Sequence, residues 1–291
     1  TPVQRPEGQD RVLTPEEVAR IEGRRQHRAD SLSRPSDPNR EAPPRGGIGE
    51  SGAVGGYNYF YMDAGDRVVV FDGEARSSIL VDPPNGRFPP LTPEAERARE
   101  AEEELAARFG EADNPENLTF SDRCIMTHGT HVPLLPNYAY NNNYTIVQTP
   151  EYIAIMMEMI HDVRIIRLGE RRPLPDDEYP WMGHSWGRWA GDTLVVETTN
   201  IRPSELREQM IFPGGSGGMV VTERFTRPDA NTINYQFTVE DPATYTSSWS
   251  GELPFRPLEG RLYEYACHEG NYALPNIMRG ARAQEREGSR R

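Results

Sequence analysis

The stretch that decides the fold is Trp181–Asn200, with the sequence WMGHSWGRWAGDTLVVETTN. It contains three of the four tryptophans and has the pattern of a β-hairpin. Trp186 and Trp189 flank the first predicted strand, residues 190–192 supply an Ala-Gly-Asp turn, and residues 193–199 form a second strand of mostly β-branched residues. Because each tryptophan can bury a large apolar area, we expect this hairpin to lie at the centre of the hydrophobic core.

Short apolar and β-branched runs recur on both sides of this hairpin, with turn residues between them. Such spacing is typical of an antiparallel sheet, and no βαβ pattern is present. Thr-Pro-Glu at residues 14–16 and 92–94 is a helix-start signature. A third Thr-Pro-Glu leaves a helix open for residues 152–159, but tyrosine and isoleucine at its start favour a strand. We predict a mainly β fold, an antiparallel barrel or sandwich with two short peripheral helices and an extended N-terminal arm.

Composition divides the chain into three parts. Residues 1–56 are an extended polar arm with one short helix, residues 57–283 carry the β pattern of a single domain, and residues 284–291 are a charged tail. Ordering such an arm costs about 1 kcal/mol per residue in backbone entropy. The arm is therefore expected to lie against a surface, either that of its own domain or that of a neighbouring subunit.

Charge and composition exclude several classes of function. The formal net charge of −13 argues against nucleic acid as a partner, because phosphate binding needs a basic surface. The sequence contains no lysine, which excludes Schiff-base chemistry and a P-loop. No run of about 18 apolar residues is present, so no membrane span is expected.

The cysteines bear on the compartment. The chain begins with Thr1 rather than Met, which suggests that a leader has been removed. In an exported protein Cys124 and Cys267 are expected to form a disulfide, worth about 3–5 kcal/mol in the chain-entropy model. In the cytosol they would instead be two buried thiols.

Several strings together carry a resemblance: YNYFYMDAG, SSILVDPPNGRFPPLTPEA, GRWAGDTLVVETTN, TERFT, FTVEDP and YEYACHEGNYAL. Through these, and above all through GRWxGDTLVV and YEYACHEGNY, residues 57–283 resemble a large family of exported bacterial proteins, mostly described as hypothetical and without an agreed function. The resemblance implies an exported β-rich protein, periplasmic or extracellular, and it implies no reaction. The segment 125–131 departs from the family pattern, which is rich in proline and glycine after the first cysteine.

The first candidate for chemistry is an acid–base group of two glutamates, two histidines and an arginine: Glu158, His161, Arg164, His268 and Glu269. Histidine and glutamate are the usual acid–base pair near neutral pH, and arginine can hold an anion bidentately. The predicted disulfide would bring the two halves of this group together. The alternative is ordinary ion pairs at strand ends.

Two weaker motifs are present. Residues 183–187 read G-x-S-x-G and are followed by Asp192, Asp229 or Asp241 and then His268, but the nucleophile elbow needs a helix after the serine, and a turn and strand follow instead. His128 and His131, with His184 or His268, could supply three imidazoles for zinc or copper. An isolated H-x-x-H is a weak signal, so neither a metal nor another cofactor is predicted.

The function we favour is self-association. Scattered aliphatic residues of the arm could each fill a pocket on a neighbouring subunit, and the Asn- and Tyr-rich segment 137–144 suits protein contacts. We therefore expect an exported homo-oligomer or filament with a structural or assembly role. The alternative is a small-molecule hydrolase or lyase that uses the Glu/His group in a pocket of the β domain.

Overall fold

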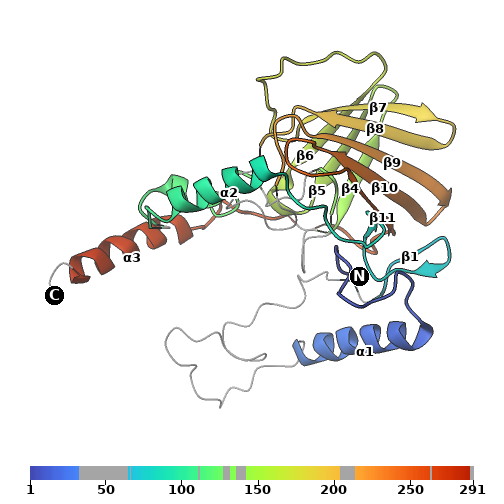
Figure 1. Ribbon diagram of the computed structural model, residues 1–291, viewed down its shortest axis with the longest axis horizontal. Helices are drawn as coiled ribbons and strands as arrows, with labels where there is room; N and C mark the ends of the chain where they lie inside the picture. The colour runs from blue at the N-terminus through green and yellow to red at the C-terminus, as the bar shows by residue number, and fades with distance from the viewer. Residues whose placement is uncertain are drawn as a thin grey trace.

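A computed structural model of the chain describes residues 1–32, 65, 67–110, 112–126, 132–135, 142–203, 214–262 and 264–288. These residues form a nine-stranded sheet, a two-stranded sheet and three α-helices (Figure 1). Residues 33–56 of the arm, the aromatic run at 57–61, His128 and His131 lie outside the described residues. The predicted domain boundaries at residues 56 and 283 stay predictions.

The large sheet has the strand order β3-β11-β10-β9-β8-β7-β6-β5-β4. Its strands, in chain order, are β3 (Leu80–Asp82), β4 (Tyr144–Gln148), β5 (Tyr152–Met157), β6 (Val163–Leu168), β7 (His184–Ala190), β8 (Thr193–Thr199), β9 (Val220–Asp229), β10 (Thr232–Glu240) and β11 (Trp249–Phe255). The prediction of a mainly β fold is confirmed, and the run at residues 152–159 begins as a strand.

Two features of this sheet differ from a closed antiparallel barrel. In the described residues β3 and β4 are not paired with each other, so the sheet is open. The pairing of β6 with β7 is parallel, whereas every other pairing in the sheet is antiparallel. The connection 169–183 is long enough for the crossover that parallel neighbours need.

The predicted hairpin is confirmed as β7 and β8, which pair from His184↔Thr199 to Ala190↔Thr193. Gly191 in the turn has φ +61°, a conformation that glycine adopts without strain. The expected position of its tryptophans is wrong, since Trp181 and Trp189 are each 49% exposed. Trp181 lies in the turn before β7, and Trp189 is the second-last residue of that strand.

The central tryptophan is instead Trp249, which is fully buried at the start of β11. Its ring contacts Phe88 at 5.0 Å and Phe237 at 5.7 Å, both edge to face. Leu134 and Leu135 enter the same core from the segment 132–135. One face of the sheet therefore packs on a single continuous core.

The start of the chain covers the β3 end of the sheet. The N–H of Leu80 donates to the carbonyl of Val3 (3.0 Å), and the N–H of Leu13 donates to Ala75 (2.8 Å) in the small sheet of β1 (Val70–Phe71) and β2 (Glu74–Ala75). The helix α1 (Pro15–Leu32) follows as predicted. The described part of the arm thus lies against its own chain.

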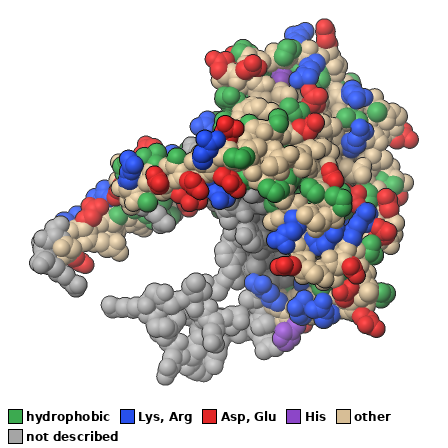
Figure 2. All heavy atoms as spheres, in the orientation of Figure 1, with side chains coloured by type: hydrophobic (Ala, Val, Ile, Leu, Met, Phe, Trp, Pro, Cys, Tyr) green, Lys and Arg blue, Asp and Glu red, His purple; other side chains and the backbone are tan. Residues whose placement is uncertain are grey.

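Two more helices lie at the periphery. The predicted helix α2 (Pro93–Ala106) is capped by Thr92, whose hydroxyl accepts from the N–H of Ala95 at 3.1 Å. The helix α3 (Ala273–Gly288) was not predicted, and it includes part of the supposed charged tail. Figures 1 and 2 show both helices extending from the body, with acidic and basic side chains interspersed along them.

Cys124 and Cys267 form a disulfide, as predicted, with an S–S distance of 2.03 Å. Both cysteines pack with Met159 and Ile160 in a small buried cluster separate from the main core. The bond joins the segment before residue 126 to the chain leading to α3. Both segments pack against the 3₁₀ turn η3 (Met159–His161). Among the described residues, no helix has both the length and the apolar character needed to cross a bilayer.

Candidate functional site

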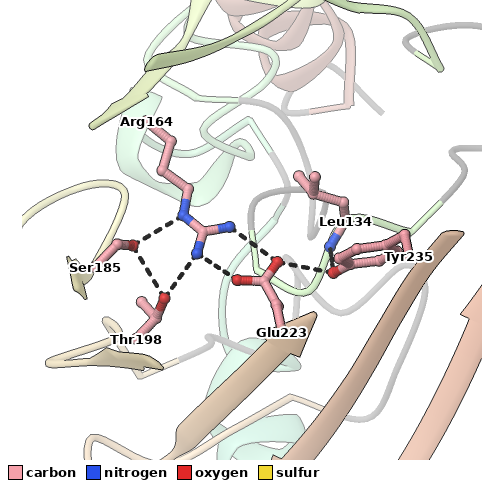
Figure 3. Close-up of polar contacts among 6 residues, drawn as sticks. All are labelled: Leu134, Arg164, Ser185, Thr198, Glu223 and Tyr235. Atoms are coloured by element: carbon pink, nitrogen blue, oxygen red, sulfur yellow. Dashed lines mark hydrogen bonds and ion pairs between the residues drawn. The ribbon is translucent and has the colours of Figure 1, made fainter. Parts of the chain in front are cut away.

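A buried polar network lies on the core face of the sheet, and Arg164 is at its centre (Figure 3). Arg164 is fully buried on β6. Its Nε donates to Ser185 Oγ at 2.9 Å, its Nη1 to Glu223 Oε1 at 3.0 Å and its Nη2 to Thr198 Oγ1 at 2.7 Å. Nη2 also donates to Glu223 Oε2, which completes a bidentate ion pair.

The network continues to the next strand and to the segment 132–135. The hydroxyl of Tyr235 on β10 donates to Glu223 Oε1 at 2.8 Å. The same oxygen of Tyr235 accepts the N–H of Leu134 at 2.8 Å. The polar groups therefore follow the strand order from β6 to β10 and fix the buried segment against the sheet.

The charge states of Arg164 and Tyr235 follow from their burial and from the nearby Glu223 carboxylate. Burial alone would lower the pKa of Arg164, but the carboxylate of Glu223 outweighs burial and raises it. Burial raises the pKa of Tyr235, and the Glu223 carboxylate raises it further. Arg164 is thus a cation and Tyr235 is neutral. Since every guanidinium nitrogen already has an acceptor, the arrangement is that of a structural ion pair.

Ser185, the serine of the G-x-S-x-G motif, belongs to this network. It is 2% exposed, and its hydroxyl lies 3.0 Å from that of Thr198. The strand β7 runs through the motif and β8 follows, so no nucleophile elbow forms. At Gly187 an added Cβ would lie 2.9 Å from Ile166 and Leu168 side chains, so close packing accounts for that glycine.

The other members of the acid–base group are distributed over two segments. Glu158 accepts from the side-chain amide of Asn143 at 3.1 Å. Burial raises the pKa of Tyr144, and the nearby Glu158 carboxylate raises it further. His268 and Glu269 are exposed beside Cys267. The disulfide cluster brings that segment to η3, which ends at His161. The side chain of His161 is not among those described, so the acid–base hypothesis stays a prediction, and an activity screen is its test.

The metal hypothesis finds no support in the described residues, where no group of three histidine, cysteine, aspartate or glutamate side chains could hold an ion. His184 Nε2 is 2.9 Å from the carbonyl of Arg172, and its ring packs beside Trp186. His128 and His131 lie outside the part of the chain that the structure describes.

The β4 end of the sheet presents a second candidate site, an open edge strand. The strand β4 pairs only with β5 in the described residues. The N–H of Glu158 donates to Asn143 and the N–H of Thr149 donates to Tyr152, so odd-numbered residues of this strand face β5. The backbone N–H and C=O groups of Tyr144, Ile146 and Gln148 therefore point away from the sheet.

The outer face of the same strands carries several apolar side chains, together with Thr145 and Arg167. The rows run Val147↔Ala154↔Ile165 and Thr145↔Met156↔Val163 across β4, β5 and β6. Four of the large side chains on this face are well exposed: Val147 (53%), Ile165 (46%), Val163 (43%) and Tyr152 (40%). We refer to these four as the outer patch. Such an exposed apolar group beside an open sheet edge is typical of an association surface.

Sequence reasoning pointed near this surface without finding it. The segment 137–144, whose Asn and Tyr content predicts protein contacts, ends where β4 begins. The signal that could have identified the edge is the strand sequence YTIVQ, which contains neither a charge nor a proline. Those are the features that natural edge strands use to prevent pairing.

Comparisons of the chain with protein-family models, with curated proteins and with solved structures find no match. The resemblance to exported bacterial proteins therefore stays a prediction. The geometry of the site is what remains to indicate a function.

Proposed function

We propose that this is an exported, self-associating protein with a structural role, and that two copies pair through the β4 edge. The observation that carries the proposal is the row of backbone groups at Tyr144, Ile146 and Gln148, which point away from β5 and have no partner among the described residues. An edge strand with free N–H and C=O groups is a template for another strand, and each pairing satisfies both chains.

The edge is complementary to itself. If a twofold axis passes through Ile146, an antiparallel second copy places Ile146 opposite its equivalent and Tyr144 opposite Gln148. These are the residues whose backbone groups point outward, so each opposed pair can exchange both hydrogen bonds. Contacts of this isologous kind close a dimer.

The two edge strands of the sheet differ in whether the described chain supplies backbone hydrogen-bond partners for them. At the β3 end the first residues supply backbone partners, with Val3 accepting from Leu80. At the β4 end the described residues supply none, and the strand is free of charge and proline. The contrast supports a role for the β4 end that the β3 end does not share.

The compartment and the size of the assembly complete the proposal. The disulfide supports a periplasmic or extracellular location, because such bonds persist in oxidising compartments. The outer patch is a second surface, and dimers joined through it would form a larger homo-oligomer or filament. Exchange of the arm between subunits would have to use residues 33–56, since the described part of the arm, residues 1–32, lies against its own chain.

Ile146→Pro tests the edge pairing. It removes an outward N–H and leaves the bonds between β4 and β5, because proline is tolerated where the N–H would face away from the sheet. Sedimentation velocity is expected to show wild-type protein at twice the chain mass of 32.9 kDa, with any larger species marking use of the outer patch. Ile146→Pro is expected to sediment as a monomer with a little-changed melting temperature.

The matched variant is Val147→Pro, which removes an N–H directed at β5 and is expected to lower the melting temperature as well. A wild-type protein that stays monomeric at high concentration, or an Ile146→Pro variant that sediments like wild type, would refute the proposal.

A further inference from the structure

Two arginines and two aromatic side chains meet on segments that do not include β4. The guanidinium carbon of Arg202 lies 5.1 Å from the ring centroid of Trp181 and 5.5 Å from that of Phe120. The guanidinium of Arg123 lies 5.1 Å from the Phe120 centroid. The two rings contact each other edge to face at 5.6 Å. Both cations are thus arranged around a single aromatic ring.

Neither arginine is paired with a carboxylate in the described part of the chain, a state that they share with other arginines such as Arg188 and Arg224. Arg76, Arg171 and Arg282, by contrast, each have an ion pair. The Nε of Arg123 is buried and lacks a hydrogen-bond acceptor in the same part of the chain. What distinguishes these two is that both guanidinium groups pack on the ring of Phe120, with no described carboxylate paired to either of them.

The nearest acid on the same segment is already engaged. Asp122 Oδ2 accepts from the N–H of Thr119 at 3.2 Å and from its hydroxyl at 2.7 Å. This turn and the neighbouring disulfide at Cys124 hold Phe120 and Arg123 in place. The carboxylate therefore shapes the segment instead of neutralising Arg123.

The segment that carries Arg202 is also held in place, by hydrogen bonds from Asn200. Asn200 has φ +51°, and its side-chain amide donates to the carbonyls of Pro175 (2.7 Å) and Glu178 (3.0 Å). These bonds join the chain just before Arg202 to the connection that carries Trp181. A site assembled from such restrained segments loses little conformational entropy when a ligand binds.

We propose that Arg123, Arg202, Phe120 and Trp181 form a binding site for an oxyanion carried on a ring, such as the carboxylate of an acidic sugar. The guanidinium groups supply planar pairs of donors for the anion. The exposed part of Trp181 offers an apolar face to the ring, since 49% of that residue is accessible. This inference is independent of the proposed pairing through β4.

The test is isothermal titration of the wild-type protein with glucuronate, with neutral glucose and with inorganic phosphate. Glucuronate is expected to bind more tightly than phosphate, and glucose is expected not to bind measurably. Arg202→Met is expected to weaken glucuronate binding about tenfold or more, because a hydrogen bond to a charged group is lost. Arg188→Met, which removes an exposed arginine of β7, is the matched control and is expected to bind as wild type does.

Near-ultraviolet circular dichroism of Arg202→Met shows whether the fold is retained, and Arg202→Lys separates charge from the planar donor pair. Lysine is expected to restore only part of the affinity. Absence of saturable binding for both anions, or equal glucuronate affinities in wild type and a folded Arg202→Met variant, would overturn the site. Equal affinities for glucuronate and phosphate would overturn the ring contact.

Discussion

Replacing Glu223 with glutamine is expected to lower the free energy of unfolding by about 3–5 kcal/mol. The substitution is nearly isosteric, but it leaves the Arg164 guanidinium as an unpaired buried cation. Both side chains of this pair are at most 1% exposed, so water cannot replace the lost carboxylate. Equilibrium unfolding in urea, followed by tryptophan fluorescence, measures the change.

The control is the double variant Arg164→Met with Glu223→Leu, which removes both charges together. Ser185 and Thr198 would still have each other as hydrogen-bond partners, and Tyr235 would still accept from Leu134. We therefore expect the double variant to be more stable than Glu223→Gln, since a buried ion pair can often be replaced by apolar residues. A Glu223→Gln variant as stable as wild type would contradict the network.

Removing the disulfide by Cys124→Ser with Cys267→Ser is expected to cost about 3–5 kcal/mol of unfolding free energy. The bond spans a sequence separation of 143 residues, so its loss returns much conformational entropy to the unfolded chain. The buried cluster with Met159 and Ile160 would also lose its cross-link. Urea unfolding of the oxidised wild type and of the double serine variant measures the difference.

Reducing the wild-type protein with dithiothreitol should give the same loss, which separates the bond from the serine side chains. A double serine variant as stable as the oxidised wild type would show that the cross-link contributes nothing. Mass spectrometry of unreduced tryptic peptides tests the bond itself, since a peptide containing both cysteines is expected.

The parts of the fold that depend on local sequence could be predicted. The β7–β8 hairpin followed from its glycine turn and β-branched strand, and α2 followed from the cap at Thr92. The parallel pairing of β6 with β7 could not be predicted, because the connection 169–183 has no local signal for its direction. The burial of Trp249 depends on Phe237 of the neighbouring strand and on Phe88, which is distant in sequence.

The site was less accessible to sequence reasoning. The residue type of Arg164 makes it a candidate, but its partner Glu223 is 59 residues away and no local pattern links the two. Arg123 and Arg202 carried no motif at all, and only the packing of two loops on Phe120 brings them together. The open edge at β4 likewise depends on where the strand falls in the sheet order.

The most direct test of self-association is a cross-link across the proposed twofold axis. In the antiparallel pairing, Ile146 faces its equivalent at a Cα–Cα distance of about 5.5 Å, which suits a disulfide. An Ile146→Cys variant under mild oxidation is therefore predicted to form a covalent dimer on a non-reducing gel. Val70→Cys, an exposed position on β1, is the control and is predicted to remain a monomer. An Ile146→Cys protein that cross-links no faster than this control would contradict pairing through β4.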